Sequence, residues 1–154
     1  MKAAVKLFIS IIIALLAGFS GSLFTTPNIQ SWYVYIQKSP YNPPAWVFAP
    51  VWTFLFILIG ISLFLLWNSR SEHKKSAIIF YFVQLILNLL WSVLFFGLHN
   101  PVAGFLDIIL LWIFILICIL KFKKVSPAAS CLFIPYFLWV SFASYLNFMV
   151  IVLN

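Results

Sequence analysis

The sequence is short of charge. Of its 154 residues only 7% are charged, and just two of them are acids. A soluble domain carries about 25% charged residues, so this chain cannot be covered by a water-soluble surface. Intrinsic disorder is excluded too, because it requires low hydrophobicity, whereas 66% of this sequence is hydrophobic. The composition therefore predicts a small integral membrane protein of one domain.

Residues that carry conventional enzyme chemistry are also scarce. The two cysteines, Cys118 and Cys131, lie in apolar stretches without the spacing of metal ligands, and His73 and His99 fall between such stretches. There is no nucleophile–base pattern, no glycine-rich phosphate loop and no dinucleotide fingerprint. Hydrolase, transferase and nicotinamide-dependent chemistry are therefore not expected. Neither a metal site nor an axial haem ligand is predicted.

What the sequence does have is long apolar runs. Five are long enough to cross a hydrocarbon core of about 30 Å as helices, namely residues 5–24, 46–67, 77–98, 102–120 and 131–152. Helices satisfy their own backbone hydrogen bonds in lipid, and the runs lack the alternation of a β-barrel. The predicted fold is an all-α bundle of five transmembrane helices. It forms a single domain over residues 1–154, with a long structured loop at 25–45.

Basic residues are unevenly distributed between these runs. Five spans place the termini on opposite sides, so that eight of the nine basic residues share one side and only Lys38 lies on the other. Because positive charge gathers in cytoplasmic segments, the N-terminus is predicted to be cytoplasmic and the C-terminus outside. The net charge of +7 thus indicates topology, with contact to anionic lipid as a lesser interpretation. Nucleic-acid binding is not predicted. The lack of a presequence and the Ile/Lys/Phe-rich composition favour a bacterial plasma membrane.

The loop at 25–45 has an unusual composition. Three prolines between residues 40 and 44 disfavour a helix there and stiffen the backbone. Its aromatic residues are Trp32, Tyr33, Tyr35 and Tyr41. Long loops in compact domains are often lids or binding elements, so a lid over the helix ends is the favoured interpretation. The alternative is an aromatic belt at the membrane interface.

Aromatic residues and amides share helix faces in three of the predicted spans. These faces hold Trp52 and Phe56 in the second span, Gln84, Asn88, Trp91 and Phe95 in the third, and Tyr136, Trp139, Ala143 and Asn147 in the fifth. An amide within a bilayer needs a partner, so the faces are predicted to point inward. Two interpretations stay open. Either the amides only hold helices together, or the faces with their three indoles line a pocket for a large, flat, mostly apolar ligand.

Two further features of the spans concern packing. Asp107 is the only acid within a predicted span, and a structural hydrogen bond is favoured there over a role in proton coupling. In the first span Ala14, Gly18 and Ser22 recur every fourth residue, as Ala17 and Gly21 do. Such stripes of small residues allow helix backbones to approach closely.

The run WYVYIQKSPYNPPAWVFAPVW, from Trp32 to Trp52, resembles the signature of the translocator protein family. This family is also called the peripheral-type benzodiazepine receptor or tryptophan-rich sensory protein family. The similarity continues through LNLLWSVLFFG (87–97) and PYFLWVSFASYLN (135–147) and covers all five spans. It implies a five-helix bundle, usually a homodimer, whose pocket the first loop closes. It also implies porphyrin ligands, above all metal-free protoporphyrin, and drugs of the isoquinoline carboxamide and benzodiazepine types.

The resemblance also implies which residues bind the ligand. By position these are Ser22, Tyr33, Pro44, Trp52, Asn88, Trp91, Trp139 and Ala143. The shared face of the second span adds Phe56, and Gln37 and Lys38 are expected near the ligand's propionates at the outer mouth. The animal sterol motif needs a basic residue after its tyrosine, and none follows Tyr145, which puts sterol recognition in doubt.

The leading hypothesis from the sequence is a membrane protein that binds a tetrapyrrole and requires no cofactor. The macrocycle is expected to stack on Trp52 and Trp139, with a polar contact from Asn88. Bacterial relatives are associated with light- and oxygen-dependent porphyrin breakdown, so Trp52 and Trp139 are also the candidate catalytic residues, in a redox role. The rival hypotheses are a transporter or channel for porphyrins or other lipophilic molecules, and a regulatory protein whose Gly18/Gly21 stripe binds a partner helix.

Overall fold

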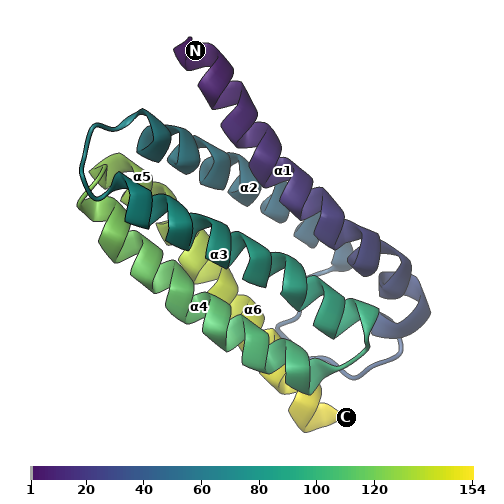
Figure 1. Ribbon diagram of the computed structural model, residues 1–154. Helices are drawn as coiled ribbons and strands as arrows, with labels where there is room; N and C mark the ends of the chain where they lie inside the picture. Colours follow the sequence, from purple (N-terminus) through teal and green to yellow (C-terminus); the bar gives the residue numbers. More distant parts are fainter. Residues whose placement is uncertain (1) are drawn as a thin grey trace.

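Every regular element in residues 2–154, the part of the chain that the computed structural model describes, is helical (Figure 1). The α-helices are α1 (Ala3–Asn28), α2 (Ala45–Asn68), α3 (Lys74–Ser92), α4 (Pro101–Lys123), α5 (Pro127–Leu132) and α6 (Ile134–Leu153), and the π-helical turns are η1 (Ile29–Tyr33) and η2 (Val93–Gly97). They form five segments that are long and apolar enough to cross a membrane. The predicted all-α fold with five spans is confirmed.

The first helix is longer than predicted. It does not end at residue 24 but runs through Pro27 to Asn28 and continues as η1. Polar side chains support this extension, because Asn28 Nδ2 donates to the Phe24 carbonyl at 2.8 Å and Ser31 Oγ to the Pro27 carbonyl at 2.8 Å. The predicted loop at 25–45 was therefore wrong in its bounds. Only residues 34–44 connect η1 to α2.

The fifth span starts earlier than predicted and is interrupted. Ser126 caps α5 by accepting a hydrogen bond from the Ala129 backbone N–H, and Pro127 occupies the first turn, where its missing N–H costs nothing. The helix breaks at Phe133 because Pro135 cannot donate to the carbonyl four residues back. The start at residue 131 was wrong because this Ser-Pro start signal was overlooked.

Glycines set how closely the first two helices pack. A Cβ on Gly60 of α2 would lie 2.6 Å from the Ile11 Cα of α1, and one on Gly18 would lie 2.5 Å from the Phe56 ring. Gly21 faces Ser92 of α3 in the same way. The small residues of α1 therefore serve contacts within the chain.

The N- and C-termini lie at opposite ends of the bundle (Figure 1).

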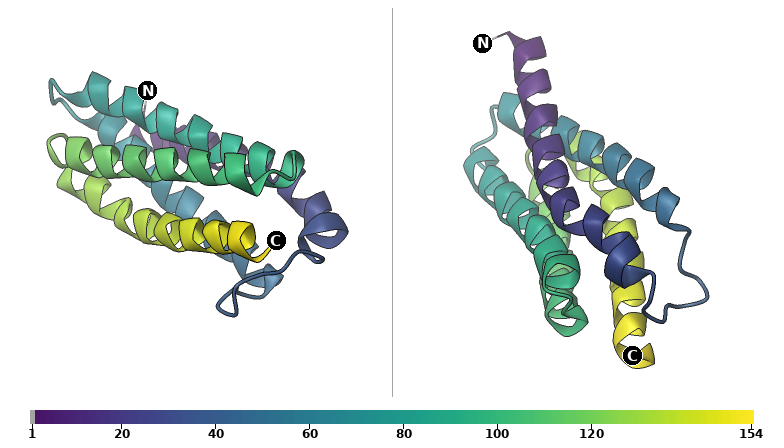
Figure 2. Two further views of the ribbon diagram at one scale, coloured as in Figure 1. Left: turned by 90° about the horizontal axis from the view of Figure 1, so that it is seen from below. Right: turned by 90° about the vertical axis from the view of Figure 1, so that its right-hand side faces the viewer.

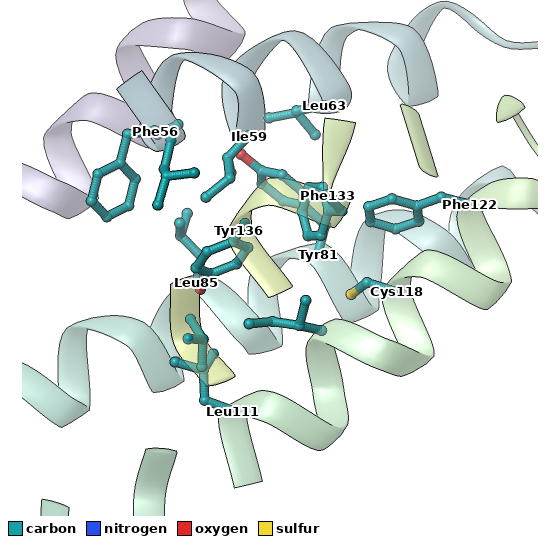
Figure 3. Close-up of a cluster of buried hydrophobic side chains, with 14 of the residues drawn as sticks. Phe56, Ile59, Leu63, Tyr81, Leu85, Leu111, Cys118, Phe122, Phe133 and Tyr136 are labelled. Atoms are coloured by element: carbon teal, nitrogen blue, oxygen red, sulfur yellow. The ribbon is translucent and has the colours of Figure 1, made fainter. Parts of the chain in front are cut away.

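The buried core occupies the half of the bundle next to α5 (Figure 3). Phe133 packs edge-on against Phe122 at 4.8 Å and against Tyr136 at 5.7 Å between ring centroids. Asp107 is 6% exposed, and none of residues 2–154 forms a hydrogen bond with its carboxyl group. The hydrogen bond expected at Asp107 is thus absent. The opposite half of the bundle holds no comparable core.

Candidate ligand-binding cavity

A cavity of about 560 Å³ lies in the half of the bundle away from α5. Four helical segments surround it: α1 with η1, α2, α3 with η2, and α6. The residues that line it are Leu15, Gly18, Phe19, Gly21, Ser22, Thr25, Thr26, Ile29, Tyr33, Ala45, Phe48, Ala49, Trp52, Thr53, Phe56, Asn88, Trp91, Ser92, Phe95, Phe96, Ala143, Leu146, Asn147 and Val150. Most of them are apolar or aromatic, as in sites for small organic molecules.

The structure brings most of the predicted site residues together. Those that line the cavity are Ser22, Tyr33, Trp52, Phe56, Asn88, Trp91 and Ala143. Four predicted residues, Gln37, Lys38, Pro44 and Trp139, do not line it. Pro44 instead precedes the first turn of α2 as its N-cap residue.

Trp91 is held rigidly in the cavity wall. Its indole Nε1 donates to Asn147 Oδ1 at 3.0 Å, and Asn147 Nδ2 donates in turn to the Pro101 carbonyl at 2.8 Å. Its ring stacks on Phe95, with centroids 5.3 Å apart and planes 18° apart. The Trp91 face is therefore a preorganised surface for a flat ligand. Asn147 thus holds helices together, as one of the two interpretations of the buried amides predicted.

Trp52 lines the cavity with an indole donor that is unused. Its ring lies 5.7 Å from Phe56 and 6.2 Å from Tyr136, between centroids. No atom of residues 2–154 accepts a hydrogen bond from its Nε1, although the side chain is half-buried and lines the cavity. The Trp52 N–H can therefore bind an acceptor atom of a ligand.

A chain of hydrogen bonds connects the cavity to the core. Asn88 Nδ2 donates to the Tyr136 hydroxyl at 2.9 Å, and that hydroxyl donates to Gln84 Oε1 at 3.0 Å. This arrangement fixes the Asn88 amide and leaves its Oδ1 without a partner among the described residues. Asn88 thus combines both interpretations of the amides: its nitrogen ties α3 to α6, and its oxygen is free to accept a hydrogen bond from a ligand.

Trp139 lies behind the cavity wall. Its ring packs edge-on against Phe48 at 5.9 Å, and Phe48 itself lines the cavity. The Trp139 Nε1 atom is buried and has no hydrogen-bond partner among residues 2–154. The expected stacking of one ligand between Trp52 and Trp139 is therefore not the arrangement seen here.

The turn η1 contributes Ile29 and Tyr33 to one end of the cavity. Residues 34–44, here called the lid, continue from η1 to α2, and the predicted mouth residues fasten them. Lys38 Nζ donates to the Tyr33 and Ile36 carbonyls at 2.7 and 2.8 Å. The backbone N–H of Gln37 donates to Asn154 Oδ1 at 2.9 Å, and Asn154 Nδ2 donates to the Gln37 carbonyl at 3.0 Å. Desolvation by burial lowers the pKa of Lys38 from its ordinary value of 10.5. Lys38 and Gln37 thus fix the lid rather than face a ligand.

Further contacts anchor η1 to the turn between α3 and α4. The Trp32 ring stacks on His99, with centroids 4.7 Å apart and planes 15° apart. His99 Nε2 also forms a 2.6 Å hydrogen bond with Asn28 Oδ1. The Tyr33 hydroxyl, on the same turn, donates to Asn42 Oδ1 at 2.8 Å. The lid is therefore held to the bundle on both sides.

Several lining residues were not predicted. Phe95 and Asn147 belong to the inward faces predicted in the third and fifth spans, although they were not among the residues expected to bind the ligand. Thr25, Thr26 and Ile29 were missed because the first helix was ended too early. Ala45 and Ala49 carry no distinctive side chain, and nothing in their spacing marks them as part of a site.

Comparison with known proteins places the whole bundle in a family. The model of the TspO/MBR family matches residues 10–153. The chain is 46% identical to the tryptophan-rich protein TspO of Chlorobaculum tepidum, over 99% of this chain and 98% of that protein. It is 45% identical to the protein of the same name from Archaeoglobus fulgidus, over 97% of each chain. It is 34% identical to the translocator protein of Ovis aries, over 85% of this chain and 79% of that protein. The chain therefore belongs to the TspO/MBR family of membrane proteins.

Proposed function

We propose that this protein binds a flat, mostly apolar tetrapyrrole of the protoporphyrin class in the cavity between α1, α2, α3 and α6. The observation that carries the proposal is the cavity itself. Its volume of about 560 Å³ lies within the range of about 300–1,000 Å³ that is typical of sites for small organic ligands. Its walls include the indoles of Trp52 and Trp91, which offer flat surfaces for a macrocycle.

The polar atoms of the cavity favour a metal-free macrocycle. Asn88 Oδ1 can accept a hydrogen bond from a pyrrole N–H, which a metallated ring lacks, and Trp52 Nε1 can donate to an unprotonated ring nitrogen or a side-chain oxygen. The residues that line the cavity include no His, Cys or Met. Tyr33, the remaining side chain of a type that ligates haem iron, has its hydroxyl engaged with Asn42 Oδ1.

The family resemblance supports the same ligand class and extends the proposal. It implies that drugs of the isoquinoline carboxamide and benzodiazepine types enter the same cavity, and that the protein is a homodimer. We also propose a cytoplasmic N-terminus in a bacterial plasma membrane, because five spans place eight of the nine basic residues on the same side of the membrane as the N-terminus. The mass of the protein in detergent tests the dimer, and protease access in oriented vesicles tests the topology.

Replacing Trp52 with alanine should weaken binding of protoporphyrin. Loss of an aromatic stacking surface costs about 1–2 kcal/mol, which corresponds to a roughly five- to thirtyfold higher Kd. Titration followed by quenching of tryptophan fluorescence, in darkness, measures the change. Trp46→Ala is the matched control, because Trp46 lies on the same helix, is 74% exposed and does not line the cavity. Equal Kd values for the two variants would count against the proposed site.

Light-dependent breakdown of bound porphyrin should depend on the Trp52 indole. The excited macrocycle takes one electron from the indole and passes it to molecular oxygen, which becomes superoxide. The indole radical cation then regains an electron from the macrocycle, and the resulting macrocycle radical cation combines with the superoxide, so that the net reaction adds O2 to the porphyrin. Trp52→Phe keeps an aromatic ring but removes the easily oxidised indole. Under aerobic illumination, loss of the porphyrin absorbance should slow to the rate of protoporphyrin in detergent alone. Breakdown at the wild-type rate in a Trp52→Phe variant that still binds would disprove the redox role.

A further inference from the structure

The walls of the cavity differ in their exposure to the outside. The lining residues from α3, η2 and α6 are buried, except Trp91, which is half-buried. The exposed lining residues all belong to α1 or α2, and they are Phe19, Thr26, Ala45, Ala49 and Thr53. The cavity is therefore closed by α3 and α6 and opens sideways, between α1 and α2.

The packing of the first two helices explains this opening. Gly60 lets α1 and α2 touch in the half of the bundle next to the core, and Gly18, at the edge of the cavity, lies against the Phe56 ring of α2. One turn further along α1, the next glycine, Gly21, faces Ser92 of α3 instead of α2. The α2 residues that follow toward the lid on this side, Thr53 and Ala49, are too small to fill the space. A slot therefore remains between the two helices.

The slot lies at the depth of the acyl chains. Ala49 and Thr53 are four and eight residues into α2, which begins at Ala45. At 1.5 Å per residue they lie about 6 and 12 Å below the start of the helix. The 24 residues of α2 rise about 36 Å, roughly 6 Å more than the hydrocarbon core, so a helix centred in the bilayer places both residues within the core, facing lipid.

At the lid end of the bundle, by contrast, hydrogen bonds fasten the segment that a ligand coming from water would have to pass. Asn154 holds both backbone groups of Gln37, and Ser39 Oγ lies 3.1 Å from the Tyr145 hydroxyl. Figure 2 shows the segment 34–44 beside the C-terminal end of α6, as these hydrogen bonds require. Opening this lid breaks several hydrogen bonds at once, whereas passage through the slot breaks none of them.

We infer that the ligand enters and leaves sideways from the bilayer, through the slot between α1 and α2, while the lid stays closed. The inference rests on the proposed function and adds the source of the ligand, which is an amphiphilic aromatic molecule dissolved in lipid. The hydroxyls at the slot suit such a ligand. Ser22 and Thr53 donate to carbonyls of their own helices at 2.7 and 2.8 Å, so their oxygens remain acceptors for a passing N–H.

Exchange kinetics of protoporphyrin test the route. The full chain in lipid nanodiscs is mixed with protoporphyrin-loaded vesicles of the same lipid, and the porphyrin absorbance gives the association and dissociation rates. Thr53→Trp narrows the slot and should slow association about tenfold, a rise of about 1.4 kcal/mol in the barrier, and dissociation should slow as well. Phe54→Trp is the matched control, since Phe54 is 57% exposed but does not line the cavity.

Two further variants separate the slot from the lid. Phe19 is 62% exposed at the edge of the slot, so Phe19→Ala should speed exchange. Asn154→Ala releases the lid from α6 and should leave the exchange rates unchanged. Faster exchange in Asn154→Ala, with wild-type rates in Thr53→Trp and Phe19→Ala, would overturn the lateral route. Absence of equilibrium binding by the wild-type chain would instead overturn the proposed function. Equilibrium binding tests the cavity itself, whereas the exchange rates test the route to it.

Discussion

The Gly60→Ala variant should be about 3 kcal/mol or more less stable than the wild-type protein, which is at the upper end of the cost of overpacking. The added Cβ would lie 2.6 Å from the Ile11 Cα and 3.0 Å from the Ser10 carbonyl oxygen. Both are backbone atoms, so no change of rotamer relieves the overlap and α1 must move away from α2. The thermal midpoint of the purified protein in detergent measures the loss.

Gly97→Ala provides the comparison for this variant. A Cβ on Gly97 would lie 3.0 Å from the Phe24 ring, which can rotate or shift because it belongs to a side chain. The same substitution should therefore change the midpoint only slightly. Similar midpoints for Gly60→Ala and Gly97→Ala would show that the close approach of α1 and α2 is not what the glycine provides.

The Tyr136→Phe variant should be destabilised by about 2–4 kcal/mol, because it leaves two buried polar groups unpaired at about 1–3 kcal/mol each. The hydroxyl accepts from Asn88 Nδ2 and donates to Gln84 Oε1. Asn88 would also lose its fixed orientation at the cavity, so protoporphyrin affinity should fall along with stability. Chemical unfolding in detergent gives the first quantity, and a dark titration gives the second.

Tyr81→Phe is a control with the opposite expectation. Tyr81 and Tyr136 are both 0% exposed and lie in the same cluster (Figure 3). The Tyr81 hydroxyl, however, has no hydrogen-bond partner among the residues that the structure describes. Removing it should be neutral or stabilising, since an unpaired buried hydroxyl is costly. Equal losses of stability in the two variants would contradict the role given to the Asn88–Tyr136–Gln84 chain.

The number of spans and the inward faces could be predicted because membrane burial follows simple periodicities. Long apolar runs set the spans, and the recurrence of Asn88, Trp91 and Phe95 every three or four residues sets a face. An amide is rarely tolerated against lipid, so these residues identify the interior of the bundle. Five of the residues expected to bind the ligand lie on these faces and line the cavity, whereas Ser22 and Tyr33, which also line it, were expected only from the family resemblance.

The rest depends on contacts that spacing does not encode. The first span was ended at residue 24, where the apolar run stops, but side-chain donors such as Asn28 support a further stretch of helix. Lys38 was expected at the ligand because it is the only basic residue on its side, yet its ammonium is bound by backbone carbonyls of the lid. Trp139 shares a helix face with Ala143, but Phe48 of another helix stands between its ring and the cavity. Which of several neighbouring residues faces the cavity therefore depends on how the folded helices pack, and not on spacing in the sequence.

The hydrogen bonds made by the Lys38 ammonium affect which ligands the cavity can distinguish. Since its ammonium already serves the Tyr33 and Ile36 carbonyls, the lidded end of the cavity offers an acidic substituent no uncommitted cation from the described residues. Discrimination must then rest on the planarity and width of the ring system and on two neutral contacts, one donor and one acceptor. Under the proposed function, tetrapyrroles that differ in the ionisation of their periphery should therefore bind with similar affinity.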